Sequence, residues 1–169
     1  DQKIKNKGKL SSHAAAAAAI KTELASIYPS VKFSVKSDSF SMGDSVHVKW
    51  TDGPTSKEVN DIISKYQYGH FNGMEDLYES TNRREDIPQS KYVSGSRSIS
   101  DEVEAILLPD AEKLFTPDHY NHVRTANDFL RQVFYNCSIP SGAIVTGIVP
   151  TGETCGVSRP ETFYKIGYT

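Results

Sequence analysis

The sequence predicts an α+β fold, in which a small antiparallel sheet has helices packed on one face and a helical C-terminal part follows. Two patterns predict it. Apolar residues recur every three or four positions in 12–27 and 55–66, and every second position in 31–35 and 46–50. The chain has 169 residues, of which 37% are hydrophobic and 24% charged. That composition supplies a core for one domain, or for a domain with a small appendage.

The first predicted helix covers residues 12–27. Ser11 or Ser12 can cap it, and the alanine run that follows has the highest intrinsic helix propensity. Pro29 ends it. The stripe expected to be buried consists of Ala17, Ile20, Leu24 and Ile27.

Two strands are expected next, because apolar and polar residues alternate along both. The apolar members are Val31, Phe33 and Val35, then Val46, Val48 and Trp50. Residues 37–44 are rich in turn formers, which predicts an antiparallel hairpin with a longish loop. Phe40 and Met42 are apolar exceptions in that loop, and we expect them to fold back onto the core.

A turn at Asp52-Gly53 leads into a second helix, through about residue 65. Thr55 and Glu58 have the spacing of a capping box. Residues 12–66 thus form a helix–strand–strand–helix core, with both helices on the same face of the sheet. The core residues expected are Ile20, Leu24, Phe33, Val35, Val46, Val48, Trp50, Val59 and Ile62.

The middle of the chain is less regular. Residues 74–79 favour either a short helix or an edge strand, 80–89 a surface loop, and 91–97 a short strand.

The last third is predicted to be mainly helical. One helix begins after Ser98 or Ser100 and stops before Pro109, and a longer one begins at Thr116-Pro117. One or two strands are expected in 143–169. The predicted organisation is a flexible basic arm (1–11), an α+β core (12–97) and C-terminal helices and short strands (98–169) packed on the same core.

Charge and hydropathy exclude several classes of protein. The net charge of −2 is neither a nucleic-acid-binding excess nor that of an acidic DNA mimic. No apolar run approaches the roughly 20 residues of a membrane span. The N-terminal lysines precede an alanine run too weakly apolar for an export signal. We therefore expect a soluble protein of the bacterial cytoplasm. Cys137 and Cys155 are then expected as free thiols, although a disulfide between them stays open.

No motif predicts a cofactor or an assembled catalytic site. His119 and His122 are one helical turn apart and could share a metal, but no third ligand is evident, so we expect no metal. Neither cysteine has the neighbouring base that a nucleophilic thiol needs. These observations favour a binding protein over an enzyme.

A basic strand face is the candidate binding site. Lys32 and Lys36 share one parity, and His47 and Lys49 the other, so all four are expected on the exposed side of the hairpin. Arg83 and Arg84 could extend this patch, which would contact phosphates in a salt-sensitive way. The alternative is an ordinary solvated face whose lysines discourage edge pairing.

Two segments resemble a known family. YPSVKFSVKSDSFSMGDSVHVKWTDGPTSKEV at residues 28–59 and FNGMEDLY at residues 71–78 resemble the large polyvalent protein-associated domain, type twenty-nine, of phage and plasmid proteins. The resemblance covers roughly residues 20–78. It implies an accessory protein of a mobile element that binds a host protein, such as a component of CRISPR-Cas or restriction defence. The alternative is a nucleic-acid-binding accessory using the basic face.

Overall fold

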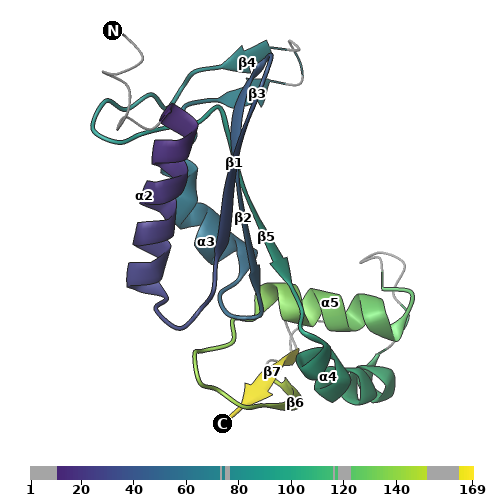
Figure 1. Cartoon of the computed structure of the whole chain (residues 1–169). Helices are drawn as coiled ribbons and strands as arrows, with labels where there is room; N and C mark the ends of the chain where they lie inside the picture. The colour runs from purple at the N-terminus through teal and green to yellow at the C-terminus, as the bar shows by residue number, and fades with distance from the viewer. Residues whose placement is uncertain (1–10, 73, 75–76, 116, 118–122, 152–163) are drawn as a thin grey trace, which may run out of the picture. The chain divides into compact units, whose positions relative to one another are not determined.

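The computed structural model describes residues 11–72, 74, 77–115, 117, 123–151 and 164–169 (Figure 1). The chain divides into two compact units. Unit 1 consists of Asp1–Trp50 and Lys57–Ser96, and unit 2 of Thr51–Ser56 and Arg97–Thr169. Each combines helices with a small sheet, which confirms the predicted α+β class. Within the described ranges, no helix is long and apolar enough to cross a membrane.

Unit 1 begins with helix α2, Ser12–Ile27, whose bounds are those predicted. Its buried stripe follows a spacing of four residues, Ala16, Ile20 and Leu24. Ala17 is partly buried and packs against the cluster, whereas Ile27 is 47% exposed because it lies off the four-residue line that Tyr28 continues. The predicted stripe was therefore wrong at Ile27 and missed Ala16.

Strands β1, Ser34–Phe40, and β2, Gly43–Thr51, form the predicted antiparallel hairpin. The predicted long loop at 37–44 is wrong, because strand pairing continues to Phe40 opposite Gly43 and leaves a two-residue turn. Phe40 and Met42 do not fold back onto the core. They are 44% and 77% exposed. Backbone bonds across the hairpin outweigh the weak strand propensity of its serine and aspartate residues.

Strand β5, Tyr92–Ser98, completes a sheet of order β1-β2-β5. Side-chain hydrogen bonds join His47 to Ser94 and Thr51 to Ser98, so β5 runs parallel to β2. A separate two-stranded sheet pairs β3, His70–Asn72, with β4, Leu77–Glu79. Of the two alternatives predicted for 74–79, the structure shows strand at Leu77–Glu79.

Helix α3, Ser56–Ile63, and the 3-10 turn η1, Ser64–Tyr66, lie on the same face of the sheet as α2 (Figure 1). Trp50 is 3% exposed, which confirms the predicted register of β2. All nine predicted core residues belong to one hydrophobic cluster, with Phe33, Val35 and Ile62 partly buried at its margin.

Unit 2 contains helix α4, Asp101–Leu114, which is capped by the Ser100 hydroxyl accepting the Val103 N–H at 3.2 Å. The prediction that this helix stops before Pro109 was wrong. Pro109 removes the bond to the Ala105 carbonyl, but both residues lie on the exposed side of α4, where water can satisfy that group.

Helix α5, Ala126–Asn136, is capped by Thr125 and Asp128 in a capping box. The predicted start at Thr116-Pro117 was wrong, since Val123–Thr125 are not helical and this cap lies further along the chain. The tail contains two strands, within the one or two predicted: β6, Val145–Pro150, and β7, Tyr164–Tyr168, which pair antiparallel. Buried residues of α4, α5, β6 and β7 form one hydrophobic cluster.

Arg97 explains why the Asp52-Gly53 turn belongs to unit 2. Its guanidinium donates to the carbonyls of Asp52, Gly53, Phe134 and Cys137 at 2.6–3.0 Å. It also lies 3.7 Å from the centroid of the Phe134 ring. Five N–H groups in a planar fork suit this cluster of carbonyls, which ties the turn to the end of α5.

Candidate nucleic-acid interface

In unit 1, one face of the three-stranded sheet is covered by α2 and α3, and the opposite face carries exposed side chains. Val46, Val48 and Trp50 of β2 point to the helices, so the alternate residues point away from them. We call this second surface the open face. Its exposed residues are Ser34, Lys36, Asp38 and Phe40 of β1, His47 and Lys49 of β2, and Tyr92, Ser94 and Ser96 of β5.

Three of the predicted basic residues meet on the open face. Lys36 is directly opposite His47 in the hairpin register, and Lys49 is opposite Ser34. Lys36 and Lys49 are therefore diagonal neighbours, with Cα atoms about 7–8 Å apart. The carboxylate on this face, Asp38, accepts the Ser39 N–H at 2.8 Å. The hairpin part of the open face thus carries two lysines and one aspartate.

His47 connects the hairpin to β5. Its Nδ1 shares a hydrogen bond of 2.8 Å with the Ser94 hydroxyl, and its Nε2 shares one of 3.3 Å with the Ser45 hydroxyl. Both ring nitrogens are thus held by hydroxyl groups, which can donate or accept. These two hydrogen bonds hold the imidazole between Lys36, its partner in the hairpin register, and Ser94 of β5.

The other predicted basic residues are not on the paired strands of the hairpin. Lys32 is exposed just before β1 and shares the parity of Lys36. Arg84 makes a two-pronged ion pair with Asp86, at 3.0 and 2.5 Å, and this hydrogen bonding lowers the pKa of Asp86. Arg83 lies over the ring of Tyr68, 4.7 Å from its centroid. The six-residue patch therefore divides, and only Lys36, His47 and Lys49 are strand neighbours.

A cluster of aromatic rings borders the open face at the turn end of the hairpin. Phe40 stacks on Tyr92, with centroids 6.2 Å apart and planes 24° apart. Tyr92 meets Tyr78 edge-on at 5.3 Å, and Tyr78 meets Tyr68 at 5.8 Å. Burial, with Tyr68 and Tyr92 nearby, raises the pKa of Tyr78 to about 12. These rings are a neutral, ordered surface beside the lysines.

Lys91 anchors this aromatic cluster. Its Nζ lies 4.9 Å from the Tyr78 centroid and 5.5 Å from that of Tyr92, and it donates to the Met42 carbonyl at 2.7 Å. The Tyr78 hydroxyl donates in turn to the Lys91 carbonyl. The sequence analysis missed this cluster. Extending β1 by period two would have placed Phe40 on the face of Lys36, but the proximity of Tyr78 and Tyr92 depends on tertiary pairing.

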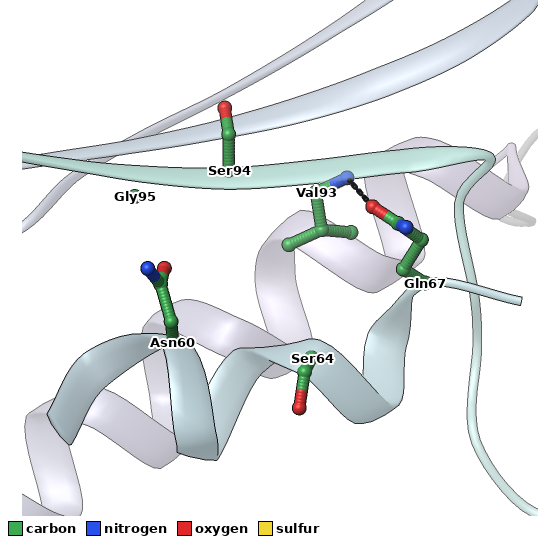
Figure 2. Close-up of a pocket in the computed structure, with 6 residues that line it drawn as sticks. All are labelled: Asn60, Ser64, Gln67, Val93, Ser94 and Gly95. Atoms are coloured by element: carbon green, nitrogen blue, oxygen red, sulfur yellow. Dashed lines mark hydrogen bonds between the residues drawn. The ribbon is translucent and has the colours of Figure 1, made fainter. Parts of the chain in front are cut away.

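A recess of about 270 Å³ lies between α3 and β5, on the helix side of the sheet. Figure 2 shows Asn60 directed at Gly95, while Ser94 points to the opposite side of the strand. The Gln67 side chain accepts the Val93 N–H at 2.8 Å, as a neighbouring strand would. The recess is polar and lies beside the outer edge of β5.

The described residues contain no group of three or more His, Cys, Asp or Glu side chains that could hold a metal ion. His119, His122 and Cys155 are outside the described residues, so their expected roles stay predictions. Cys137 is half-buried where α5 ends. A second recess, in unit 2, is lined by Ile99, Arg131, Phe134 and Tyr135 among others, but its Arg97 is committed to backbone carbonyls.

The fold and the open face define an α+β protein built around a helix–hairpin–helix unit, with a basic and aromatic sheet surface. The chain belongs to the family described as large polyvalent protein associated domain 29, which matches residues 11–106. This confirms the resemblance seen over 20–78 and extends it across unit 1 into α4. It is a domain associated with phage and plasmid proteins. Comparison with curated proteins and with solved structures finds no match.

Proposed function

We propose that this chain is a nucleic-acid-binding accessory protein of a mobile genetic element. The observation that carries the proposal is the alignment of Lys36, His47 and Lys49 on the open face of the sheet. Lysine ammonium groups neutralise phosphates without reading bases, so the expected binding is electrostatic and largely independent of sequence.

Charge position, rather than total charge, supports this proposal. The whole chain has a net charge of −2, so a non-specific attraction to polyanions would be weak. The open face places two lysines beside the hydroxyl groups of Ser34, Ser94 and Ser96. Serine hydroxyl groups commonly donate to phosphate oxygens in nucleic-acid complexes. Arg84 is excluded from this role because Asp86 neutralises it.

The proposal is tested by reversing the two lysine charges in the double variant Lys36→Glu, Lys49→Glu. Its matched control is Lys21→Glu, Lys57→Glu, which makes the same charge change at exposed positions of α2 and α3 on the covered side. Fluorescence anisotropy of a labelled oligonucleotide at about 50–200 mM salt measures the affinity. The slope of log K against log salt should fall by roughly 0.7–0.9 for each phosphate that the variant no longer neutralises.

We expect the open-face variant to lose about tenfold or more in affinity, and the control to stay within about twofold. Equal losses in the two variants would mean that only net charge matters. Absence of binding by the unmodified protein at about 50 mM salt would reject the proposed function.

Protein binding is the second candidate, and the outer edge of β5 favours it. Val93 N–H points away from β2, since it bonds Gln67, and Gly95 has the same parity along the strand. An extended segment of a host protein could add there as a further strand, beside the recess in Figure 2. Counter-defence, such as inhibition of CRISPR-Cas or restriction, would be the corresponding role, and it is supported by the family's phage and plasmid setting.

This candidate is tested with Asn60→Arg, which fills the recess from an exposed position of α3. A host protein captured from nuclease-treated bacterial lysate at about 200 mM salt should be lost with this variant, because a strand interface tolerates that salt better than phosphate binding does. Oligonucleotide binding should be unchanged. Capture that survives Asn60→Arg would place the interface elsewhere.

A further inference from the structure

We infer that the open face binds single-stranded nucleic acid in preference to duplex, by stacking a base on the Phe40–Tyr92 ring pair. This inference rests on the proposed function and narrows its ligand. Phe40 and Tyr92 are 44% and 36% exposed, and both have the parity of the open face. An aromatic surface beside lysines is the combination that unpaired strands use, with rings for the bases and cations for the phosphates.

Phe40 is held outward by the hairpin. It is the last residue of β1, pairs with Gly43 across a two-residue turn, and is no part of the hydrophobic cluster of unit 1. Tyr92 occupies one side of its ring, at an interplanar angle of 24°. The exposed part of the Phe40 ring is therefore a flat apolar surface, on which a base can stack as a third ring beside Phe40 and Tyr92.

The ring pair is packed against neighbouring side chains. Tyr92 is braced edge-on by Tyr78, and Lys91 lies near both of these rings while bonding the Met42 carbonyl of the turn. A platform already held in place loses little conformational freedom on binding, which favours affinity. The Lys91 ammonium adds a positive charge over the same rings, 5.5 Å from the centroid of Tyr92.

Distance along β1 relates the platform to the lysines. Phe40 and Lys36 are four residues apart on one strand, which corresponds to roughly 13–14 Å. A strand of a few nucleotides spans that length, with a base on Phe40 and phosphates near Lys36 and Lys49. In a duplex the base faces are buried in the stack, so the rings could not use them.

Anisotropy titrations of the full chain with a labelled 12-nucleotide oligo(dT) and with a labelled 12-base-pair duplex test the inference. We expect the single strand to bind at least tenfold more tightly. Phe40→Leu keeps an apolar side chain without a ring, and should lose about tenfold for the single strand only. Phe40→Tyr should retain the affinity, and Met42→Ala, a neighbour in the turn that is 77% exposed, should leave it unchanged.

A second readout uses Phe40→Trp. Trp50 is buried, so the added indole is the solvent-exposed tryptophan in the described part of the chain, and its emission should be quenched when a base stacks on it. Equal affinity for the two oligonucleotides, unchanged binding by Phe40→Leu, or an unquenched indole would overturn the inference. Equal binding of the two oligonucleotides, abolished for each of them by the double variant Lys36→Glu, Lys49→Glu, would support the proposed function and reject the preference for single strands. Absence of binding by either oligonucleotide would reject both the proposed function and the single-strand preference.

Discussion

Asp44 is the residue on which three segments of unit 1 converge. Its Oδ1 accepts the Lys91 N–H at 2.8 Å and the Ser90 hydroxyl at 2.9 Å, and its Oδ2 accepts the Ser12 hydroxyl at 3.3 Å. The ring of His13 is 3.6 Å away. One carboxylate at the start of β2 thereby joins the first turn of α2 to the segment that enters β5.

The pKa of Asp44 follows from these contacts. Burial raises it, but the hydrogen bonds from Lys91, Ser90 and Ser12, with the charge of His13, together hold it below the ordinary value. A depressed native pKa means that the ionised carboxyl favours folding. That stabilisation is complete above the ordinary aspartate range, near pH 4, and is lost as the pH falls through the native pKa.

Asp44→Asn should therefore destabilise unit 1 by about 1–3 kcal/mol at pH 7, the usual effect of losing hydrogen bonds to a charged group. The difference from the unmodified protein should shrink as the pH is lowered below about 4, because the native carboxyl then becomes neutral as well. Urea unfolding followed by the emission of buried Trp50 measures both quantities. Asp38→Asn, at an exposed position of β1, serves as the control, and a difference that stayed constant down to about pH 2 would contradict this account.

At the scale of elements, local sequence patterns predicted the helices and strands whose bounds depend only on their own residues. The alanine run and Pro29 predicted α2 to the residue, and alternation around Trp50 predicted the register of β2. Residues 37–44 were misread because their serines, aspartates and glycine are typical of loops, whereas cross-strand bonds hold them in strands. The helix was wrongly predicted to end before Pro109, because the exposed side of α4 is known only from the fold.

The candidate site divides in the same way. Period-two alternation alone brings Lys36, His47 and Lys49 to one face. The Phe40–Tyr92 pair joins two strands that are distant in sequence, and no local pattern contains that information. The parallel addition of β5 to β2 was likewise beyond the local reading, since each strand looks the same whichever neighbour it has.

Gly95 lies where β5 closely approaches Trp50 and Asn60 on the covered side of the sheet. A Cβ atom there would lie 2.9 Å from the Asn60 Oδ1 and 3.1–3.2 Å from two ring atoms of Trp50. The Asn60 amide can turn aside, but the buried indole has little room to move. A glycine at this point lets the strand lie directly on the ring.

Gly95→Ala should accordingly cost about 1–3 kcal/mol, the range for overpacking a filled site. Ser96→Ala, one residue further on and exposed on the open face, should change stability by less than about 0.5 kcal/mol. Thermal and urea unfolding measure the stability of both variants. Equal stability of the two would mean that β5 does not lie against Trp50 as described.

At the scale of the whole molecule, the buried residues that the structure describes form two hydrophobic clusters. Unit 1 is closed by α2, α3 and β2 around Trp50, and unit 2 by α4, α5, β6 and β7 around Leu107 and Val133. The family match covers all of unit 1 that is described, and of unit 2 it covers residues 51–56 and 97–106. Both the basic residues and the aromatic platform of the open face belong to unit 1.

Two clusters predict separable responses to core mutations. Leu107 is fully buried in unit 2, and Leu107→Ala should cost about 2–5 kcal/mol there. Hydrogen exchange should then rise in α4, α5 and β6, while amides of α2 and β2 keep their protection and oligonucleotide binding persists. Val48→Ala, fully buried in unit 1, should give the reciprocal pattern and weaken binding. If Leu107→Ala instead raised exchange in α2 and β2 as strongly as in α4, the units would unfold as one, and the open face would depend on unit 2 for its stability.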